Sequence, residues 1–461
     1  MRQGIIAAIS TPPGKGGVAI IRASGDGALA LAERIFHPLS GKTLSSYPAR
    51  TQVYGYIKRG DEVIDDGLAT LFKKGSSYTG EETVEFSIHG GILVTRRVLE
   101  CIFAEGAIPA EAGEFTRLAF INGKLDLCEV EAIGDLLEAK SEEQLKLLSQ
   151  PSRERLKGAI SEIREQTVRL LGSIWARIDY PEEDLGEKSA SEVLEELSEI
   201  KSKLAALIST YRTGRAIREG IDTLLVGSPN AGKSTLYNLL LGEDAAIVTD
   251  IPGTTRDLLE RTVPLGRALL RLTDTAGVRG EDGIDEVEKI GISRTLSRLA
   301  EAELILALFD SSREMTCEDE ETLGALKNAK GAKIAVLTKC DKRHPEFKLD
   351  ADGFDAVIEI SAKEAPDEAV MKVSESVNAL FLDDRISTSS DAIVSSARQH
   401  AALSSALSAL ERAIEAYRLG TPEDAAASDI EYALSAIGEI DGRSVSEEIV
   451  SDIFSRFCVG K

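Results

Sequence analysis

A glycine-rich stretch in the middle of the chain constrains the fold more than any other feature. The apolar segment 223–226 runs directly into Gly227-x-x-x-x-Gly232-Lys233-Ser234, and a helical pattern follows. This spacing between a strand and a helix is typical of a P-loop, whose glycines allow backbone N–H groups to surround phosphate oxygens. We expect Lys233 to reach the β- and γ-phosphates and Ser234 to bind Mg²⁺. The sequence therefore predicts an α/β nucleotide-binding domain.

Three further segments follow in the order that guanine-nucleotide domains use. In "LRLTDTAG", Asp274 can hold Mg²⁺ through water, and the N–H of Gly277 can meet the γ-phosphate. In "AVLTKCD", Asp341 can accept hydrogen bonds from the N1–H and 2-amino groups of guanine, a pair of donors that adenine lacks. In "EISAKE", the backbone of residues 361–363 can bind guanine O6. Thr338 stands where an asparagine is usual, which leaves the strength of base selection open.

The residues that would support hydrolysis depart from the Ras-like pattern. Thr255 in "IVTDIPGTTRD" is the expected switch residue that contacts Mg²⁺ and the γ-phosphate. Val278 follows DTAG, where Ras-like enzymes place a water-orienting glutamine, so another group must position the water. Glu286 and Glu288 are candidates, although a solvated start of a helix explains either of them more simply.

Asn230 within the P-loop is a candidate ligand for a cation. It could hold K⁺ against the phosphates, and the ion would supply the charge that an arginine finger supplies elsewhere. A simple hydrogen bond within the loop explains Asn230 equally well. The switch carbonyls that would complete the potassium site belong to Thr249, Ile251 and Thr254.

The segments on either side of the nucleotide domain differ in the spacing of their apolar residues. Residues 1–120 contain short alternating stretches, which predict an α+β domain. Apolar residues recur at helical spacing from about 124 to 215 and again from 390 to 457, with prolines 151 and 181 at expected helix boundaries. Within residues 1–120, we expect strands near 5–9, 17–23, 52–58, 67–73 and 83–88, and helices at 27–36 and 91–105.

These patterns predict a multidomain chain in which one domain is inserted into another. The expected N-terminal α+β domain covers 1–120, and an all-α domain is built from 121–215 and 381–461. The inserted α/β P-loop domain covers 216–380.

Charge and composition limit the class of protein. The net charge of −23 argues against broad nonspecific binding to nucleic acid. Residues 1–120 hold equal numbers of acidic and basic side chains, so RNA would need a local basic patch or a partner protein. The five cysteines form no CxxC pair, and no apolar run reaches the roughly 18 residues that a membrane span needs. We therefore expect a cytoplasmic protein with reduced thiols and no membrane association.

The C-terminal sequence "FSRFCVGK" admits three interpretations. Chain ends are commonly frayed. A prenylation box would use Cys458 as acceptor, but Gly460 and Lys461 fit that motif poorly. A docked tail would explain Phe454 and Phe457, because an exposed tail gains nothing from two large aromatic residues.

The motifs together resemble one family. "AAISTPPGKGGVAIIRASG", "YTGEETVEFSIHGG", "GEFTRLAFINGKLDL", the nucleotide motifs with "GTTRD" and the terminal "FCVGK" are similar, in the same order along the chain, to the MnmE/TrmE family of tRNA-modification GTPases. The resemblance implies an N-terminal domain similar to folate-binding aminomethyltransferases, a helical domain in two segments and an inserted Ras-like G domain. Ala112 and Val459 stand where the family usually has proline and isoleucine, and neither change touches the chemistry.

The resemblance also implies a function. The family works with the flavoprotein MnmG, in a heterotetramer, to place an aminomethyl or carboxymethylaminomethyl group on carbon 5 of the wobble uridine of certain tRNAs. A tetrahydrofolate, in its 5-formyl or 5,10-methylene form, supplies the one-carbon unit. The family forms homodimers through the N-terminal domains, and the G domains meet when K⁺ and GTP are bound, which activates hydrolysis to GDP.

Site residues are implied by the same resemblance. The folate contacts fall on Arg22, Glu85, Lys124 and Lys461, which would dock the tail at the folate. Glu288 corresponds to the proposed water-positioning glutamate, and Cys458 to the tail cysteine, whose catalytic role competes with simple packing. Magnesium ligands fall on Ser234 and Thr255. The positions that contact GTP are Asn230, Ala231, Gly232, Lys233, Ser234, Thr235, Thr249, Asp250, Ile251, Pro252, Gly253, Thr254, Thr255, Asp274, Thr275, Ala276, Gly277, Thr338, Lys339, Asp341, Ser361, Ala362 and Lys363.

Two other functions stay open at the level of sequence. A GTPase switch of the ribosome-assembly type would share the G domain, but it gives no role to "TPPGKGG", "NGKLDL" or "FCVGK". A folate-binding scaffold whose hydrolysis only gates a partner would differ in whether Cys458 takes part in chemistry.

Overall fold

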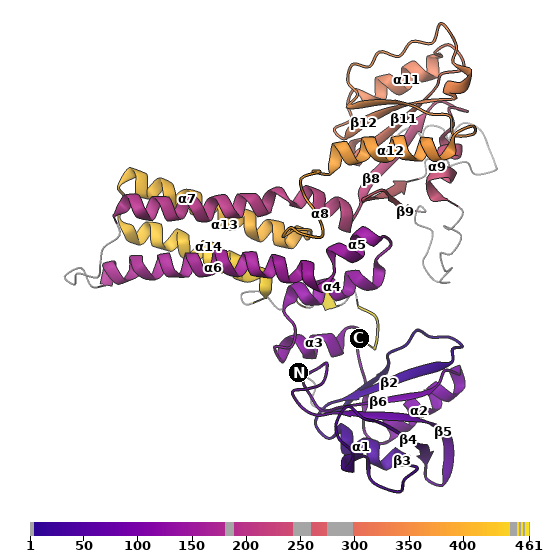
Figure 1. Cartoon of the computed structure of the whole chain (residues 1–461), viewed down its shortest axis with the longest axis vertical. Coiled ribbons are helices and arrows are strands. Elements are labelled where there is room, and N and C mark those ends of the chain that lie inside the picture. Colours follow the sequence, from indigo (N-terminus) through magenta and orange to yellow (C-terminus); the bar gives the residue numbers. More distant parts are fainter. Residues whose placement is uncertain are drawn as a thin grey trace, which may run out of the picture. The chain divides into compact units, whose positions relative to one another are not determined.

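The computed structural model of the chain describes residues 4–179, 189–242, 260–273, 298–442, 450, 453–454 and 457–460. The chain forms two compact units (Figure 1): residues 1–137 with 438–461, and residues 138–437. The division into three domains stays a prediction, because a division of the chain into two compact units does not test the bounds of the three domains. Within the described ranges, no helix is both long and apolar enough to cross a membrane.

A mainly antiparallel sheet forms the centre of the first unit. Its seven strands lie in the order β3-β4-β5-β6-β2-β1-β7. Only β1 and β7 pair in parallel among the neighbouring strands of this sheet. The strands are β1 (Ile6–Ile9), β2 (Val18–Ser24), β3 (Phe36–Pro38), β4 (Gln52–Arg59), β5 (Glu62–Phe72), β6 (Thr83–His89) and β7 (Ile108–Pro109).

Two helices, α1 (Ala28–Ile35) and α2 (Ile92–Ala104), pack on this sheet through an apolar core. The predicted strands and both predicted helices are confirmed, with shifts of a few residues at their ends. The sequence did not predict β3 and β7, because strands this short show no alternating pattern. The unit also contains the short η1 (Leu44–Ser46), α3 (Glu114–Ile121) and most of α4 (Leu127–Glu138).

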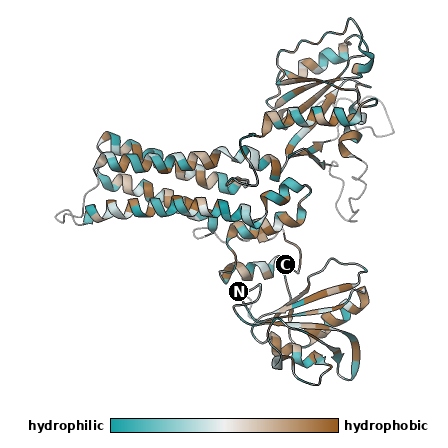
Figure 2. Cartoon of the chain, viewed as in Figure 1, coloured by the Kyte–Doolittle hydropathy of each residue, from teal (hydrophilic) through white to brown (hydrophobic). Residues whose placement is uncertain are grey.

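Helices make up one part of the second unit. They are the short α5 (Glu142–Leu147) and α8 (Tyr211–Arg218), the longer α6 (Gln150–Asp179), α7 (Ala190–Ser209) and α13 (Ala397–Leu419), and most of α14 (Glu423–Asp441). Segments that are far apart in sequence lie side by side here, since α7 packs on both α6 and α13 (Figure 1). Figure 2 shows hydrophilic and hydrophobic residues mixed along these helices, as expected of amphipathic helices with one buried face. The predicted helical character is confirmed for the described residues, and Pro151 lies in the first turn of α6 as predicted, whereas Pro181 lies outside the described residues.

A mostly parallel sheet makes up the rest of the second unit. Its six described strands lie in the order β13-β12-β11-β8-β10-β9, and only β9 runs antiparallel to its neighbour. The strands are β8 (Ile221–Gly227), β9 (Glu260–Leu265), β10 (Ala268–Thr273), β11 (Leu304–Asp310), β12 (Ala332–Thr338) and β13 (Ala356–Glu359). The helices around it are α9 (Lys233–Leu241), α11 (Cys317–Leu326), α12 (Pro366–Phe381) and the short η4 (Cys340–Lys342).

The central strands of this sheet are buried on both faces. Leu225 on β8 contributes to a core shared with α9 and α12, whereas Leu224 and Val226 contribute to another core that includes Leu326 of α11. Every residue of β11 is buried. Continuous apolar strands of this kind are typical of a parallel sheet covered on both sides, so the predicted α/β class is confirmed.

Candidate nucleotide site and candidate N-terminal ligand site

The P-loop connects the end of β8 to the start of α9. Gly232 has a φ of 99° and Asn230 a φ of 62°, so both lie in the left-handed region. A Cβ on Gly227 would lie 2.4 Å from the carbonyl oxygen of Leu308 on the adjacent β11, so only glycine fits between the strands. The loop is thus shaped by backbone requirements that the sequence pattern already signalled, and its N–H groups precede a helix N-terminus.

Lys233 lies over the loop that it follows. Its Nζ donates hydrogen bonds to the carbonyl oxygens of Gly227, at 2.6 Å, and Ser228, at 2.9 Å. The ammonium group is therefore already held at the loop, where a phosphate group would take the place of these neutral acceptors. Ser234 and Thr235 are exposed in the first turn of α9, a position where a hydroxyl can bind a cation.

Thr338 ends β12 and holds the P-loop to the sheet. Its buried Oγ1 lies 2.8 Å from the carbonyl oxygen of Ala231 and 3.2 Å from that of Phe309. A hydroxyl has one proton, so it donates to one of these carbonyls at a time. The side chain at this unusual position therefore connects the two nucleotide motifs through the backbone, which sequence reasoning did not predict.

Two further contacts assemble the region expected to bind the base. Ser361 Oγ donates a hydrogen bond of 2.6 Å to Oδ1 of Asp341, which brings "TKCD" and "SAK" together. Lys339 has a φ of 57°, and its Nζ lies 2.5 Å from Oδ2 of Asp310. Ala362 is half-buried and Lys363 exposed beside Ser361.

Asp310 is a site residue that the sequence analysis missed. Burial by itself would raise the pKa of this carboxyl, but hydrogen bonds from Lys339 and Ser312 hold its pKa below the usual value. Asp310 is therefore an anion at neutral pH and neutralises the lysine of the base motif. The available signal was an aspartate that directly follows the apolar run "LILALF", in a strand adjacent to the P-loop strand.

Many of the predicted site residues lie outside the described residues. The structure therefore describes Ser234 among the expected magnesium ligands and Asn230, which is exposed, among the expected potassium ligands. The positions outside the described ranges are Thr249, Asp250, Ile251, Pro252, Gly253, Thr254, Thr255, Asp274, Thr275, Ala276, Gly277, Val278, Glu286, Glu288 and Lys461.

In the first unit, Arg22 and Glu85 form an ion pair. They face each other across β2 and β6, and both Nε and Nη2 of Arg22 lie 2.8 Å from Oε1 of Glu85. The guanidinium carbon also lies 5.3 Å from the ring centre of Tyr78 and 5.4 Å from that of Phe115. Burial raises the pKa of Tyr78, whose hydroxyl is 2.9 Å from that of Thr116. A cation, an anion and two aromatic rings thus meet in one mostly buried place.

Lys124 contacts the loop that carries Tyr78, and no contact joins it directly to the Arg22–Glu85 pair among the described interactions. Its Nζ donates a hydrogen bond of 2.8 Å to the carbonyl oxygen of Gly75. The neighbouring Asn122 donates to the carbonyl oxygen of Thr79, at 2.7 Å. Among the predicted folate residues, Lys124 and Arg22 therefore both contact the loop 73–82, which lies between β5 and β6.

The C-terminal tail is docked in the same unit. Val459 forms a β-bridge with Ala112, and Ser10 Oγ donates a hydrogen bond of 3.0 Å to the carbonyl oxygen of Gly460. Gly460 has a φ of 102°, and a Cβ there would lie 2.0 Å from the carbonyl oxygen of Ile9. The chain therefore passes too close to the end of β1 for any residue except glycine.

The aromatic residues before the tail explain why it docks. Phe454 and Phe457 are buried and pack with Val130 of α4 and with Phe120. The N–H of Gly113 donates a long hydrogen bond of 3.4 Å to the carbonyl oxygen of Cys458, whose side chain is exposed. Among the three interpretations of "FSRFCVGK", the docked tail is the one that the described residues support.

Comparisons with known proteins agree with this architecture. The family described as the GTP-binding protein TrmE N-terminus matches residues 5–124, and the family described as the MnmE helical domain matches residues 127–458.

The similar curated proteins are full-length relatives. "tRNA modification GTPase MnmE" of Thermoanaerobacter pseudethanolicus is 41% identical over 99% of each chain. The proteins of the same name from Clostridioides difficile and Thermotoga maritima are 37% and 38% identical, again over 99% of each chain. Among solved structures, Era of Aquifex aeolicus bound to GDP·AlF4⁻ matches 41% of this chain and 66% of its own, with 23% identity and a TM-score of 0.26.

Proposed function

This chain belongs to the MnmE family of tRNA modification GTPases, and from that premise we propose that it hydrolyses GTP to GDP and modifies tRNA together with MnmG. The product is a uridine that carries an aminomethyl or carboxymethylaminomethyl group at carbon 5 of the wobble position. The observation that carries the proposal is the 41% identity over 99% of each chain, because it covers the flanking domains as well as the P-loop. We further propose that the protein acts as a cytoplasmic homodimer, within a heterotetramer with MnmG.

The described residues support guanine-nucleotide binding. The P-loop N–H groups and Lys233 would hold the phosphates, and Asp341, oriented by Ser361, would accept hydrogen bonds from guanine. Ser234 would hold Mg²⁺, which neutralises phosphate charge when it is bound. Thr255 and Asp274 complete this proposal on the sequence alone.

We propose that hydrolysis depends on K⁺ and on contact between two G domains. Asn230 is exposed on the P-loop with a left-handed backbone, so its side chain is accessible to an ion beside the phosphates. The other expected potassium ligands, Thr249, Ile251 and Thr254, and the water-positioning Glu288 are proposed from sequence.

The test of this part compares GTP hydrolysis by the full-length protein in KCl and in NaCl. We expect a clear stimulation by K⁺ that the variant Asn230→Ala loses. Equal rates in both salts, with intact GDP binding, would contradict the potassium site and leave the GTPase assignment standing.

The first unit supports binding of an anionic, aromatic ligand such as a tetrahydrofolate. Arg22 and Glu85 together present donors and acceptors beside two aromatic rings, which suits a polar heterocycle, and Lys124 adds a positive charge on the neighbouring loop. The docked tail would bring Lys461 and the exposed thiol of Cys458 toward the same region. We propose 5-formyl- or 5,10-methylenetetrahydrofolate as the ligand, and Cys458 as the side chain to examine for chemistry.

Calorimetric titration of 5-formyltetrahydrofolate into the full-length protein tests this part. We expect binding by the full chain and a clear loss in a variant that lacks residues 458–461, whereas Val459→Ala, which trims an exposed side chain, serves as the matched control. Absence of binding by the full-length protein would remove one-carbon chemistry from this chain and favour a GTPase switch without modification chemistry.

A further inference from the structure

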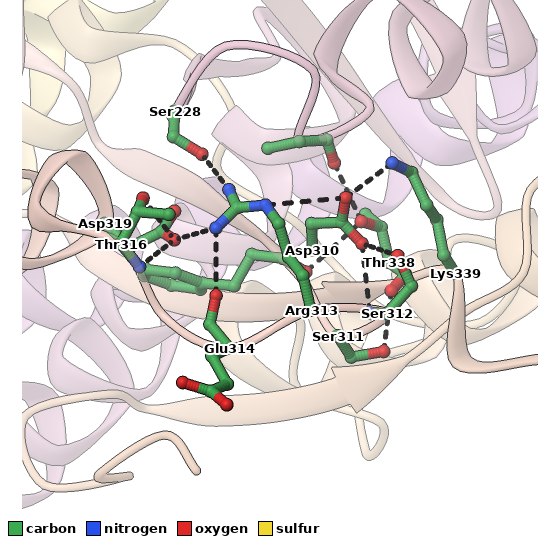
Figure 3. Close-up of polar contacts among 12 residues, drawn as sticks. Ser228, Asp310, Ser311, Ser312, Arg313, Glu314, Thr316, Asp319, Thr338 and Lys339 are labelled. Carbon is green, nitrogen blue, oxygen red and sulfur yellow. Dashed lines mark hydrogen bonds and ion pairs between the residues drawn. The ribbon is translucent and has the colours of Figure 1, made fainter. Parts of the chain in front are cut away.

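The loop 311–316, which leads from β11 into α11, lies against both nucleotide motifs (Figure 3). The N–H and Oγ of Ser311 both donate to the carbonyl oxygen of Thr338, at 3.0 Å and 2.7 Å. The loop is therefore attached to the end of β12, where the base motif begins. No nucleotide-binding pattern marks this segment in the sequence.

Arg313 of this loop points at the P-loop. Its Nη2 donates a hydrogen bond of 3.0 Å to Oγ of Ser228, the first residue after Gly227. Its Nη1 lies 2.8 Å from Oδ2 of Asp319, and its Nε lies 3.8 Å from Oδ2 of Asp310 (Figure 3). The carboxylates are almost completely buried, with side chains 3% and 5% exposed, while Arg313 is 32% exposed. Two buried anions thus hold the guanidinium in one orientation.

Asp319 is itself fixed by the start of α11. Its Oδ2 accepts hydrogen bonds from the N–H of Thr316 at 3.0 Å and from the Thr316 hydroxyl at 2.9 Å. Burial would raise the pKa of this carboxyl, but hydrogen bonds from Ser228, Thr316 and Arg313 keep it below the usual value. Because Asp319 is ionised and cannot move without breaking the helix cap, Arg313 has a rigid anchor.

The P-loop is consequently held at two places by the same network. Arg313 holds it at Ser228, and Thr338 holds it at Ala231. Asp310 lies between these two contacts. It pairs with Lys339, the residue after Thr338, and it also lies near Arg313. A loop fixed in this way loses less conformational freedom when a nucleotide binds.

We propose that Arg313 is a positioning residue for nucleotide binding, which orders the P-loop through Ser228 and connects it to the base motif without touching the nucleotide. The inference rests on the proposed binding of GTP. The experiment below distinguishes a failure of GTP binding from a failure of the inference, because it measures wild-type binding separately from the coupling between Arg313 and Ser228.

The experiment measures binding of fluorescently labelled GDP to the full-length protein and to Arg313→Gln, Ser228→Ala and the double variant. Each single change removes the same charge-assisted hydrogen bond, so we expect each to weaken binding by about tenfold. We expect the loss in the double variant to be clearly smaller than the product of the two single losses, since both changes remove the same bond between Arg313 and Ser228. Arg385→Gln is the matched control, because Arg385 pairs with Asp383 at an exposed position in the linker after α12.

A second readout distinguishes positioning from a general loss of structure. The KM for GTP should rise with the Kd of GDP, while kcat at saturating GTP stays within about twofold, because the groups that support hydrolysis are unchanged. The preference for GDP over IDP, which lacks the 2-amino group, should also be unchanged, because Asp341 is untouched.

The outcomes are separable. If wild-type protein does not bind GDP, both the proposed function and this inference fail. If wild type binds but Ser228→Ala and Arg313→Gln bind equally well, or their effects add, the inference alone fails. If Arg313→Gln does not fold, as judged by circular dichroism, Ser228→Ala decides, since it removes one hydroxyl and keeps both carboxylate contacts of Arg313.

Discussion

Thr338 shows how a single buried hydroxyl can connect two motifs that are distant in sequence. The buried hydroxyl lies within hydrogen-bond distance of the carbonyl oxygens of Ala231 and Phe309. An unsatisfied carbonyl in such a place would cost stability, so the hydroxyl matters for the shape of the P-loop. We therefore expect Thr338 to act on base selection indirectly, through the position of the loop relative to Asp341.

We expect Thr338→Ala to weaken GDP binding by about tenfold, because it leaves a buried carbonyl without a donor. Thr338→Ser keeps the hydroxyl and should bind close to wild type. Titration with labelled GDP and IDP checks both statements. A variant that loses the preference for GDP over IDP while keeping its GDP affinity would show that Thr338 acts on the base instead.

Tyr417 on α13 makes the helical part of the second unit sensitive to alkali. Burial, reinforced by Glu423, raises the pKa of Tyr417 to about 12. In the unfolded chain a tyrosine titrates near pH 10. The stability that the neutral phenol contributes is therefore fully present below about pH 10 and is lost as the pH rises toward about 12.

We expect the melting temperature of the wild type to fall more steeply between about pH 10 and 12 than that of Tyr417→Phe, which has no proton to lose. Thermal unfolding followed by circular dichroism at several pH values measures the difference. Parallel curves for the two proteins would show that Tyr417 does not contribute to the alkaline loss.

At the scale of elements, a close backbone contact joins α8 to the segment that follows α12. Thr210 and Thr213 accept hydrogen bonds from the N–H groups of Val394, at 2.9 Å, and Asp383, at 3.0 Å. Directly after Thr213, a Cβ on Gly214 would lie 2.2 Å from the carbonyl oxygen of Val394. The two chain segments that connect the α/β part of this unit to its long helices are therefore packed backbone to backbone.

We expect Gly214→Ala to lower stability, although glycine to alanine within a helix usually raises it by up to about 1 kcal/mol. The backbone would have to move apart, and overpacking of this kind costs roughly 1–3 kcal/mol. Gly158→Ala and Gly172→Ala on α6 are matched controls, because no atom lies within 4 Å of a Cβ at either position. Urea unfolding should place Gly214→Ala below wild type and both controls at or above it; the reverse order would refute the close contact.

At the scale of the whole molecule, both ends of the chain belong to one compact unit. Helices α3 and α4 and the tail share an apolar cluster that includes Val130, Phe454 and Phe457. The chain therefore closes this unit only after the entire second unit has been traversed. Contacts between residues so distant in sequence form late in folding, so we expect them to slow the folding of this unit.

We expect Phe454→Ala to destabilise the first unit by about 3 kcal/mol or more, because it leaves a cavity between α4 and the tail. Val459→Ala, at an exposed position in the same tail, should have little effect. Calorimetric scans would show a lower transition for Phe454→Ala, while GDP binding, whose described residues lie in the second unit, should be unchanged. Unchanged unfolding would mean that the aromatic anchor is not what holds the tail.

Local requirements of the backbone explain why much of this protein could be read from its sequence. The P-loop needs glycine at 227 and 232 because of a neighbouring strand and a left-handed backbone, and such needs appear directly as a motif. Helix and strand periodicity likewise reports which face is buried, so α1, α2, the longer strands of the N-terminal sheet and the helical character of 124–215 and 390–457 were predicted. The strands β3 and β7 were missed because they are too short for any period.

The contact partners of individual side chains, in contrast, could not be predicted from the sequence. Nothing in "DSSRE" shows that Arg313 reaches Ser228, and nothing near position 338 shows that its hydroxyl meets Ala231. The sequence likewise left the tail between frayed and docked, and the choice depends on a fit between Gly460 and Ile9 that joins opposite ends of the chain. Such contacts arise where three or four separate segments converge, so their energies depend on relative positions in space that no local pattern encodes.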